Sequence, residues 1–370
     1  MSELGRRRLL QIAGASVVSG AIFLGGSGLL TTRAEYEGDD RIYTCSYDAT
    51  EFGLEDTGQT VSEAWTQTGS AGQTRDIMPD RAGNLLTADD NGLHKWRQTQ
   101  RGLDHEWVYE AISGSIRGIT VDRDNDYYIG SWTADQGFHK VVEADDDPKQ
   151  AWVYRWDDDT GMITAAADPE KRIALALKNG SVHLIREHNG EPAVVWQWDS
   201  GSDEIVREVL WDHSGALYVA SEDHTLYKLR ETDSGEPTVV WRYDAGNMIF
   251  GASVTPDGSI YLAVNDGTVH CLRAVGGEPQ QQWVYQQTSY EGTAPDDEYF
   301  WDGLVHQVAA RPDPDSTAVY SCAYGENTTH KIEVVDGEPR QVWEHAGHTD
   351  NVREVRIHNE QFGTTPDSWP

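Results

Sequence analysis

The sequence has little of three things that would each point to a class of protein. Its 370 residues include only three cysteines, too few for a disulfide scaffold or for a multi-cysteine zinc or iron–sulfur site. Basic residues are scarce as well, with 29 lysines and arginines against 62 aspartates and glutamates. This balance argues against nucleic acid as a partner, because phosphate binding needs a clustered basic surface. No Gly-rich phosphate loop, nucleophile elbow or Ser/His/Asp arrangement is recognisable.

The acidic charge is spread along the whole chain. The formal net charge is −33, only seven of the 29 basic residues are lysines, and 38% of residues are hydrophobic, enough to form a core. Dense carboxylates keep a protein hydrated where salt screens ordinary repulsion. The composition therefore looks like the adaptation of an extreme halophile, which indicates a habitat and no activity.

Residues 1–34 differ from the rest of the chain. Three arginines at 6–8 precede an almost uncharged stretch at 12–30, and Thr32-Arg33-Ala34 offers a cleavage site. This segment resembles a twin-arginine export signal, with Gly5 where a serine or threonine is usual. The alternative is a membrane anchor through 12–30. Both predict an extracytoplasmic protein, secreted or anchored to the cell envelope; whether the signal is cleaved stays open.

The body of the chain, 35–370, is a repeat anchored by tryptophan. Settings such as EWVYE, AWVYR and VWRYD recur at intervals of 42, 45, 44, 45, 42 and 60 residues. The repeating residues are Trp65, Trp107, Trp152, Trp196, Trp241, Trp283 and Trp343. Within a unit, short β-rich runs such as 206–210, 217–220 and 225–229 are separated by turn residues, which leaves little room for helix. A period of about 44 residues with this pattern predicts an all-β fold, a β-propeller with one four-stranded sheet per repeat.

The two ends of the repeat determine the number of blades. Residues 41–47 look like 319–324, the second strand of a unit, and 351–356 supply one more first strand after the last tryptophan. We therefore predict a seven-bladed propeller whose last blade is closed by the N- and C-terminal strands, which removes both exposed edges.

The units resemble the quinoprotein-like repeat family, or PQQ-like repeats, across 41–358. The resemblance rests on strings such as DGSIYLAVNDGTVHCLRAVGGEPQQQW at 257–283, and 347–350 look like the start of a WD40 unit. Both families are propellers, a fold that hosts binding platforms, lyases, transferases and dehydrogenases. Quinoprotein dehydrogenases usually have eight blades, adjacent disulfide-bonded cysteines, and calcium and quinone over a tryptophan floor. The chain lacks the first two, so we expect no PQQ or other cofactor.

Five histidines occupy the same position in the third strand of their units: His94, His139, His183, His270 and His330. Third strands diverge around a propeller, whereas a zinc site needs its ligands within about 2.1 Å of one ion. We therefore predict that these side chains pack between blades, with no metal site. Cys45 and Cys322 sit at matching positions and are interpreted as packing residues without a disulfide. The alternating carboxylates Asp122, Asp124 and Asp126 are interpreted as a turn, because the glycine and distal glutamate of a calcium loop are missing.

A second column lies near the start of the first strands, which line the central channel. It contains Arg75, Arg117, Arg207, His306 and Arg353, with Thr164 and Phe250 in the other two units. Equivalent positions converge at the top face, where the first strands begin, and clustered guanidinium groups are suited to carboxylate, sulfate or phosphate. The alternative is that each arginine pairs with a nearby carboxylate, for which Asp76, Glu208 and Glu354 are candidates.

An insertion at 286–303 follows a fourth strand and should rise on the same face. Its aromatic residues Tyr290, Tyr299, Phe300 and Trp301 suggest a binding loop for sugar or protein, or a lid that packs on the propeller. Asn179 and Asn327 match the N-glycosylation pattern in exposed turns.

Together these features favour an exported, non-enzymatic binding or scaffold protein. We expect its top face to hold a protein or an anionic small molecule or glycan, and the chain to be a monomer or part of an envelope complex. The alternative is a propeller enzyme at the channel mouth: a lyase or sulfotransferase with His306 or His348 as general base, or a quinoprotein-type oxidoreductase.

Overall fold

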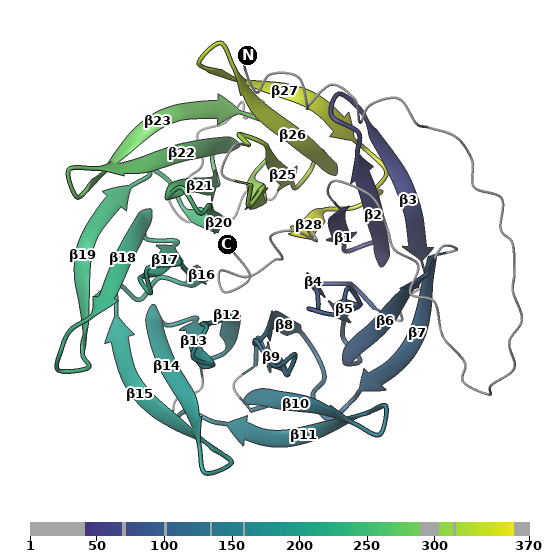
Figure 1. The fold of residues 1–370 in the computed structure, drawn as a ribbon, viewed down its shortest axis with the longest axis vertical. Helices are drawn as coiled ribbons and strands as arrows, with labels where there is room; N and C mark the ends of the chain where they lie inside the picture. The colour runs from purple at the N-terminus through teal and green to yellow at the C-terminus, as the bar shows by residue number, and fades with distance from the viewer. Residues whose placement is uncertain are drawn as a thin grey trace, which may run out of the picture. The chain divides into compact units, whose positions relative to one another are not determined.

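The fold was obtained as a computed structural model that describes residues 41–68, 72–99, 102–133, 135–157, 160–288, 303–313 and 316–358. The regular elements of these residues are all strands, arranged as seven four-stranded antiparallel sheets in a ring (Figure 1). The predicted all-β, seven-bladed propeller is therefore confirmed. The predicted signal or anchor at 1–34 lies outside the described residues, within which no helix has the length and apolarity to cross a membrane.

The blades follow one another in chain order, apart from the shared one. The shared sheet contains β28 (Val352–His358), β1 (Arg41–Ser46), β2 (Thr50–Asp56) and β3 (Val61–Thr68). The next three sheets are β4 (Asp76–Pro79), β5 (Leu85–Ala88), β6 (Leu93–Thr99) and β7 (Gly102–Tyr109); β8 (Ile116–Val121), β9 (Tyr127–Ser131), β10 (Phe138–Ala144) and β11 (Asp147–Tyr154); β12 (Met162–Ala167), β13 (Arg172–Leu177), β14 (Ser181–His188) and β15 (Glu191–Asp199). The last three are β16 (Val206–Trp211), β17 (Leu217–Ser221), β18 (Thr225–Glu231) and β19 (Pro237–Asp244); β20 (Ile249–Val254), β21 (Ser259–Val264), β22 (Thr268–Val275) and β23 (Glu278–Gln286); β24 (Val305–Ala310), β25 (Val319–Ala323), β26 (Thr328–Val335) and β27 (Glu338–His345).

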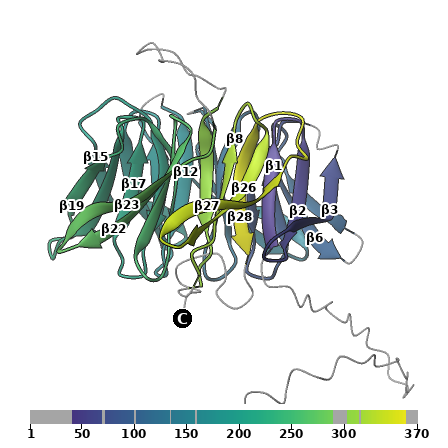
Figure 2. The same cartoon turned by 90° about the horizontal axis from the view of Figure 1, so that it is seen from above.

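Burial changes across each blade, and the sequence follows it. Second strands such as β17 are buried at every residue, since neighbouring blades cover both of their faces, and they carry small and apolar side chains. Outer strands such as β19 are half exposed and keep one large anchor in the core, Trp241 at 5% exposure. Figure 2 shows the ring from its side, with the strands running between two opposite faces.

The last blade is closed as predicted. Strand β28 pairs antiparallel with β1, with Thr44 opposite Val355 and Ile42 opposite Ile357. Three apolar residues of β28 are buried at 0–7% exposure in the same cluster as Ile42. The C-terminal strand thus completes both the ladder and the core of a blade that begins at the other end of the chain.

Three of the five histidines in the column join neighbouring blades, as predicted, whereas His94 and His330 contact His105 and Glu344 of their own blades. In three cases a tyrosine at or near the end of one outer strand contacts a histidine of the next blade. The oxygen-to-nitrogen distances are 2.8 Å for Tyr109 and His139, 3.0 Å for Tyr154 and His183, and 3.3 Å for Tyr243 and His270. Cys45 and Cys322 are buried free thiols, which confirms their interpretation as packing residues.

Candidate functional site

Three members of the arginine column lie on a β-bulge that recurs in the inner strands, whereas Arg117 is paired with Gly130 and Arg75 precedes β4. In β16, β24 and β28 the pairing skips one residue, and the skipped residues are Arg207, His306 and Arg353. A bulge re-aims the side chain at the extra residue. As a result this residue and its successor both line the channel: Arg207 with Glu208, and Arg353 with Glu354.

The bulge also shows that one predicted member of the arginine column belongs elsewhere. In β12 the skipped residue is Ile163, and Thr164 falls in the following row, opposite Ala176. The placement of Thr164 in the arginine column was therefore wrong. Two apolar residues in succession, Met162 and Ile163, both suggested core, whereas the bulge turns the second one into the channel.

The structure brings the four arginines and His306 together around one small cavity at the top of the channel. The cavity has a volume of about 20 Å³, enough for about one or two water-sized groups. Its wall also contains Phe250 and the three carboxylates that follow in the next row. The exposed fractions of Arg207 and Arg353 are only 6% and 5%.

Two of the arginines are in ion pairs, although not with the carboxylates predicted. Arg75 lies 3.0 Å from Asp90, and Arg207 pairs with the buried Glu222, to which its Nε also donates a hydrogen bond. Both partners lie in turns after second strands, so they are distant in sequence from the arginines that they neutralise. The pairing of Arg75 with Asp76 and of Arg207 with Glu208 is not found.

The other two arginines have no carboxylate of a described residue within 4.0 Å. Arg353 donates from Nη1 to the hydroxyls of Tyr324 at 2.7 Å and Tyr47 at 3.0 Å. Among the described residues, the Arg117 side chain has one hydrogen-bond partner, Ser115 Oγ at 3.3 Å from Nε, and its buried Nη1 has none. Burial, together with the positive charges of Arg353 and Arg207, lowers the pKa of Arg117 to about 9. Arg117 is thus a cation whose surroundings disfavour its charge.

A further cation and two aromatic rings complete the site, and the sequence analysis missed all three. Lys178, just after β13, lies with its Nζ 4.1 Å from the ring centre of Trp132, and the Arg117 guanidinium lies 4.2 Å from the same ring. Burial and the charges of Arg117 and Arg207 lower the pKa of Lys178. Although burial opposes it, the guanidiniums of Arg353, Arg117 and Arg75 lower the pKa of Tyr47 to about 8. The three lie outside the arginine column but share a repeat position of their own, directly after the second strand of a blade, so alignment of this position is the signal that could have found them.

His306 shares the cavity wall with the four arginines. Its ring stacks on Tyr324 with centroids 4.6 Å apart, and neither ring nitrogen makes a hydrogen bond of normal geometry to any residue that the structure describes. Burial and the charges of Arg353, Arg207 and Arg117 hold its pKa well below 6.5, so the imidazole is neutral. The other candidate base, His348, is outside the cavity wall: its Nε2 lies 2.9 Å from Thr44 Oγ1 beside Phe52.

The next row down the channel is acidic and is held by Arg356. Nη2 of Arg356 lies 3.2 Å from Glu354 and 3.8 Å from Asp76, while Gln307 Nε2 donates to Glu208 at 2.7 Å and to Glu354 at 3.3 Å. Burial raises the pKa of all three carboxyls, that of Glu354 to about 7. Glu354 therefore pairs with Arg356, two residues along the same strand, and not with Arg353.

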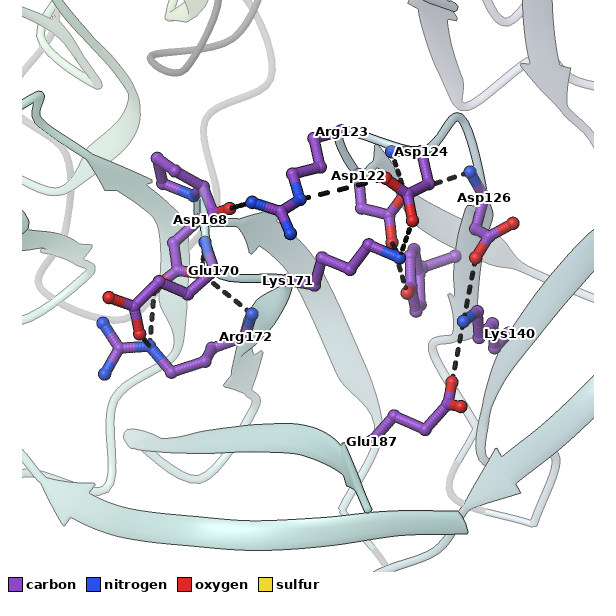
Figure 3. Close-up of polar contacts among 12 residues, drawn as sticks. Asp122, Arg123, Asp124, Asp126, Lys140, Asp168, Glu170, Lys171, Arg172 and Glu187 are labelled. Atoms are coloured by element: carbon purple, nitrogen blue, oxygen red, sulfur yellow. Dashed lines mark hydrogen bonds and ion pairs between the residues drawn. The ribbon is translucent and has the colours of Figure 1, made fainter. Parts of the chain in front are cut away.

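The carboxylates of the calcium-like motif are already paired (Figure 3). Lys171 pairs with Asp124, and Lys140 lies 2.9 Å from Asp126 and 2.7 Å from Glu187. Asp122 Oδ1 accepts the backbone N–H groups of residues 124 and 126, as in an ordinary turn. The described residues contain no group of three or more histidine, cysteine or acidic side chains suited to a metal ion.

The predicted aromatic binding loop lies outside the described residues, since positions 289–302 are not among them. Its flanks are described: β23 ends at Gln286, β24 begins at Val305, and Thr288 Oγ1 donates to the carbonyl of Gly303. Both predicted glycosylation residues lie in hairpin turns, Asn179 between β13 and β14 and Asn327 between β25 and β26.

Comparison with known proteins supports the fold and no more. No protein-family model matches the chain, and no curated protein matches it. Among solved structures, a protein from Lactobacillus plantarum is similar with a TM-score of 0.71 at 12% identity, over 86% of this chain and 99% of the other. A Bacteroides fragilis protein provisionally described as a 6-phosphogluconolactonase gives 0.70 at 9% identity, over 87% and 98%. The β-propeller domain of Cps50 (Swd1) from Myceliophteria thermophila gives 0.59 at 14% identity, over 77% and 89%. At these identities the likeness defines the chain as a β-propeller without assigning a subtype or an activity.

Proposed function

We propose that this chain is an exported, non-enzymatic β-propeller of the PQQ-like or WD40-like kind that binds a compact anionic group at the top of its channel. Export is inferred from the twin-arginine-like segment at 1–34. The ligand is a small anion or the carboxylate, sulfate or phosphate group of a larger molecule, including a glycan.

The observation that carries the proposal is Arg117. A buried guanidinium nitrogen without a hydrogen-bond partner is costly, and the usual compensation is a carboxylate, which the described residues do not supply. Arg353 and Lys178 likewise have no carboxylate partner there. An anion in the cavity would accept hydrogen bonds from Arg117 and offset all three charges.

The charge balance of the two rows limits the charge of the ligand. Six cations surround the channel, namely Arg75, Arg117, Lys178, Arg207, Arg353 and Arg356. Five carboxylates belong to the same network, namely Asp76, Asp90, Glu208, Glu222 and Glu354. With Glu354 ionised the network has one net positive charge, and with Glu354 protonated it has two. A monoanion or a dianion therefore neutralises it.

The proposal is tested by calorimetric titration of the wild type and of Arg117→Ala/Arg207→Ala. The ligands are sulfate, phosphate and uronic-acid oligosaccharides. Each charge-assisted hydrogen bond contributes about 1.5–3 kcal/mol, so the double variant should bind about 10²–10⁴-fold more weakly. Because Arg207→Ala also removes the ion pair with the buried Glu222, the matched control is Arg75→Ala, which removes the ion pair with the half-exposed Asp90 and should leave more of the affinity. If no anion binds to the wild type, the proposal fails.

A second candidate is a propeller lyase or hydrolase at the same mouth. The specific observation is that neutral His306 and Glu354, whose pKa is near 7, line one cavity with the guanidiniums, which suits proton transfer next to a bound anion. The similar Bacteroides fragilis protein is provisionally described as a 6-phosphogluconolactonase, a name that denotes a phosphorylated sugar lactone as substrate. If the protein turns over such a lactone, and if His306→Asn loses this activity but still binds the anion, the enzymatic function would replace the non-enzymatic one.

A further inference from the structure

A second hollow lies away from the channel, between the outer strands of two neighbouring blades. It has a volume of about 570 Å³, within the range of small-molecule sites. Strand β11 and the loop after it form one side, and β14 and β15 form the other. The wall includes the indole rings of Trp156 and Trp198 and the charged side chains of Arg155, Asp157 and Asp199. We refer to it as the rim groove.

The groove has an apolar strip of two indole rings and one aliphatic side chain. Trp156 and Trp198 are both partly exposed, and Val194 is 46% exposed. The rings are held in place from behind: Trp156 Nε1 donates to the carbonyl of Thr160 at 2.6 Å, and Trp198 packs edge-on against Tyr227 at 5.0 Å. Fixed, partly exposed aromatic rings give contact area at little cost in conformational entropy.

Polar side chains surround this strip. Arg155, Asp157, Gln197 and Asp199 are exposed members of the wall and offer planar guanidinium, carboxylate and amide groups. The one cation and two carboxylates give these groups a net charge of −1. The Arg155 guanidinium also donates to the carbonyl of Asp135 at 2.5 Å, so it is positioned before any ligand arrives. The wall thus has one excess negative charge, in contrast to the channel mouth.

We propose that the rim groove binds a neutral oligosaccharide. A pyranose ring has an apolar C–H face, which stacks on an indole, and a rim of hydroxyls, which exchange hydrogen bonds with carboxylate and amide groups. The groove presents both features side by side, and its volume exceeds that of one sugar ring. The proposal does not depend on the anion site, since the two sites share no residue.

The repeat provides a matched control. Tyr243 occupies in β19 the place that Trp198 occupies in β15, two residues after the anchoring tryptophan, and it lies outside the groove. Trp156→Ala and Trp198→Ala test the strip, and Trp156→Phe keeps a ring at the first position. Because Trp198 contacts Tyr227, thermal melting of each variant shows whether the fold is retained.

The probes are mannotriose, cellotriose, chitotriose and xylotriose, and their binding is measured by calorimetry and by saturation-transfer NMR. The protein used carries no glycan on Asn179, because this residue lines the groove. We expect one of them to bind at micromolar to millimolar concentration. Trp156→Ala should weaken this binding about tenfold or more, Trp156→Phe should retain most of it, and Tyr243→Ala should leave it unchanged.

Three outcomes overturn the proposal. The first is that none of the four trisaccharides binds to the wild type at about 10 mM. The second is that Tyr243→Ala weakens binding as much as Trp156→Ala, which would place the sugar elsewhere. The third is that tetramethylammonium binds in place of the sugars and loses its affinity in Asp157→Asn, which would make the groove an aromatic cation site.

Discussion

Replacing Arg117 by methionine should stabilise the ligand-free protein while it weakens anion binding. Methionine retains an unbranched, apolar contact with Trp132 and removes the charge that has no carboxylate partner among the described residues. Most substitutions at a binding site do not raise stability, so the direction of the effect is informative.

The magnitude follows from the pKa of Arg117. A decrease from 12.5 to about 9 corresponds to about 5 kcal/mol of unfavourable interaction with the charged form. The side chain also gives up its stacking on Trp132 and its hydrogen bond to Ser115, which together offset about 2–3 kcal/mol. The free energy of unfolding should therefore rise by about 2–3 kcal/mol in Arg117→Met.

Urea denaturation of both proteins in about 1 M sodium chloride measures this difference, and repeating it with 50 mM sulfate separates specific binding from the general effect of salt. Exclusion of sulfate from the surface stabilises both proteins alike. A bound sulfate adds stability to the wild type alone, about 2.7 kcal/mol at a hundred times its dissociation constant. The reasoning is refuted if Arg117→Met is less stable than the wild type and both respond equally to sulfate.

Three other perturbations test the fold and its charges. Deleting everything after Trp343 removes β28 with its buried Val352, Val355 and Ile357, so the free energy of unfolding should fall by about 5 kcal/mol or more. An unchanged melting temperature would contradict the closure of the ring. Glu354 has a folded-state pKa of about 7, raised from 4.5, so its contribution to stability is present below about pH 4.5 and is lost as the pH rises through 7. The free energy of unfolding of Glu354→Gln should therefore exceed that of the wild type by up to about 3 kcal/mol at pH 8 and by little at pH 4.5. Denaturation curves at both pH values measure this difference. Removing 1–34 leaves 25 basic and 61 acidic residues, a net charge of −36. Because 0.1 M salt, with a Debye length of about 10 Å, screens this charge only in part, the melting temperature should rise with potassium chloride into the molar range. A melting temperature that does not change with salt would show that the acidic surface is not a salt adaptation.

The ring could be predicted because the repeat is long and regular. Seven tryptophans at similar intervals determine the number of blades, and the likeness of 41–47 to 319–324 determines where the chain enters the repeat. The same regularity located the convergence of Arg75, Arg117, Arg207 and Arg353, because equivalent positions of inner strands meet at the channel.

What the repeat could not predict depends on departures from it. Arg207 pairs with Glu222, fifteen residues away, because a tight hairpin brings the end of β17 next to the start of β16. The bulge that shifts Ile163 into the arginine row is a feature of the backbone, without a residue type that marks it. Lys178 and Trp132 share one repeat position, directly after the second strand of a blade, but the residue type at this position changes from blade to blade, so no single residue type marks it.

The central claim is that an anion sits against Arg117, and anomalous scattering tests it most directly. Crystals grown or soaked in selenate, or in bromide, should give one strong anomalous peak inside the channel, at hydrogen-bonding distance from Arg117 Nη1 and close to Arg353 and Lys178. The peak should disappear in Arg117→Met crystals treated in the same way. Peaks confined to the outer surface, with the channel mouth free of anomalous density, would contradict the account.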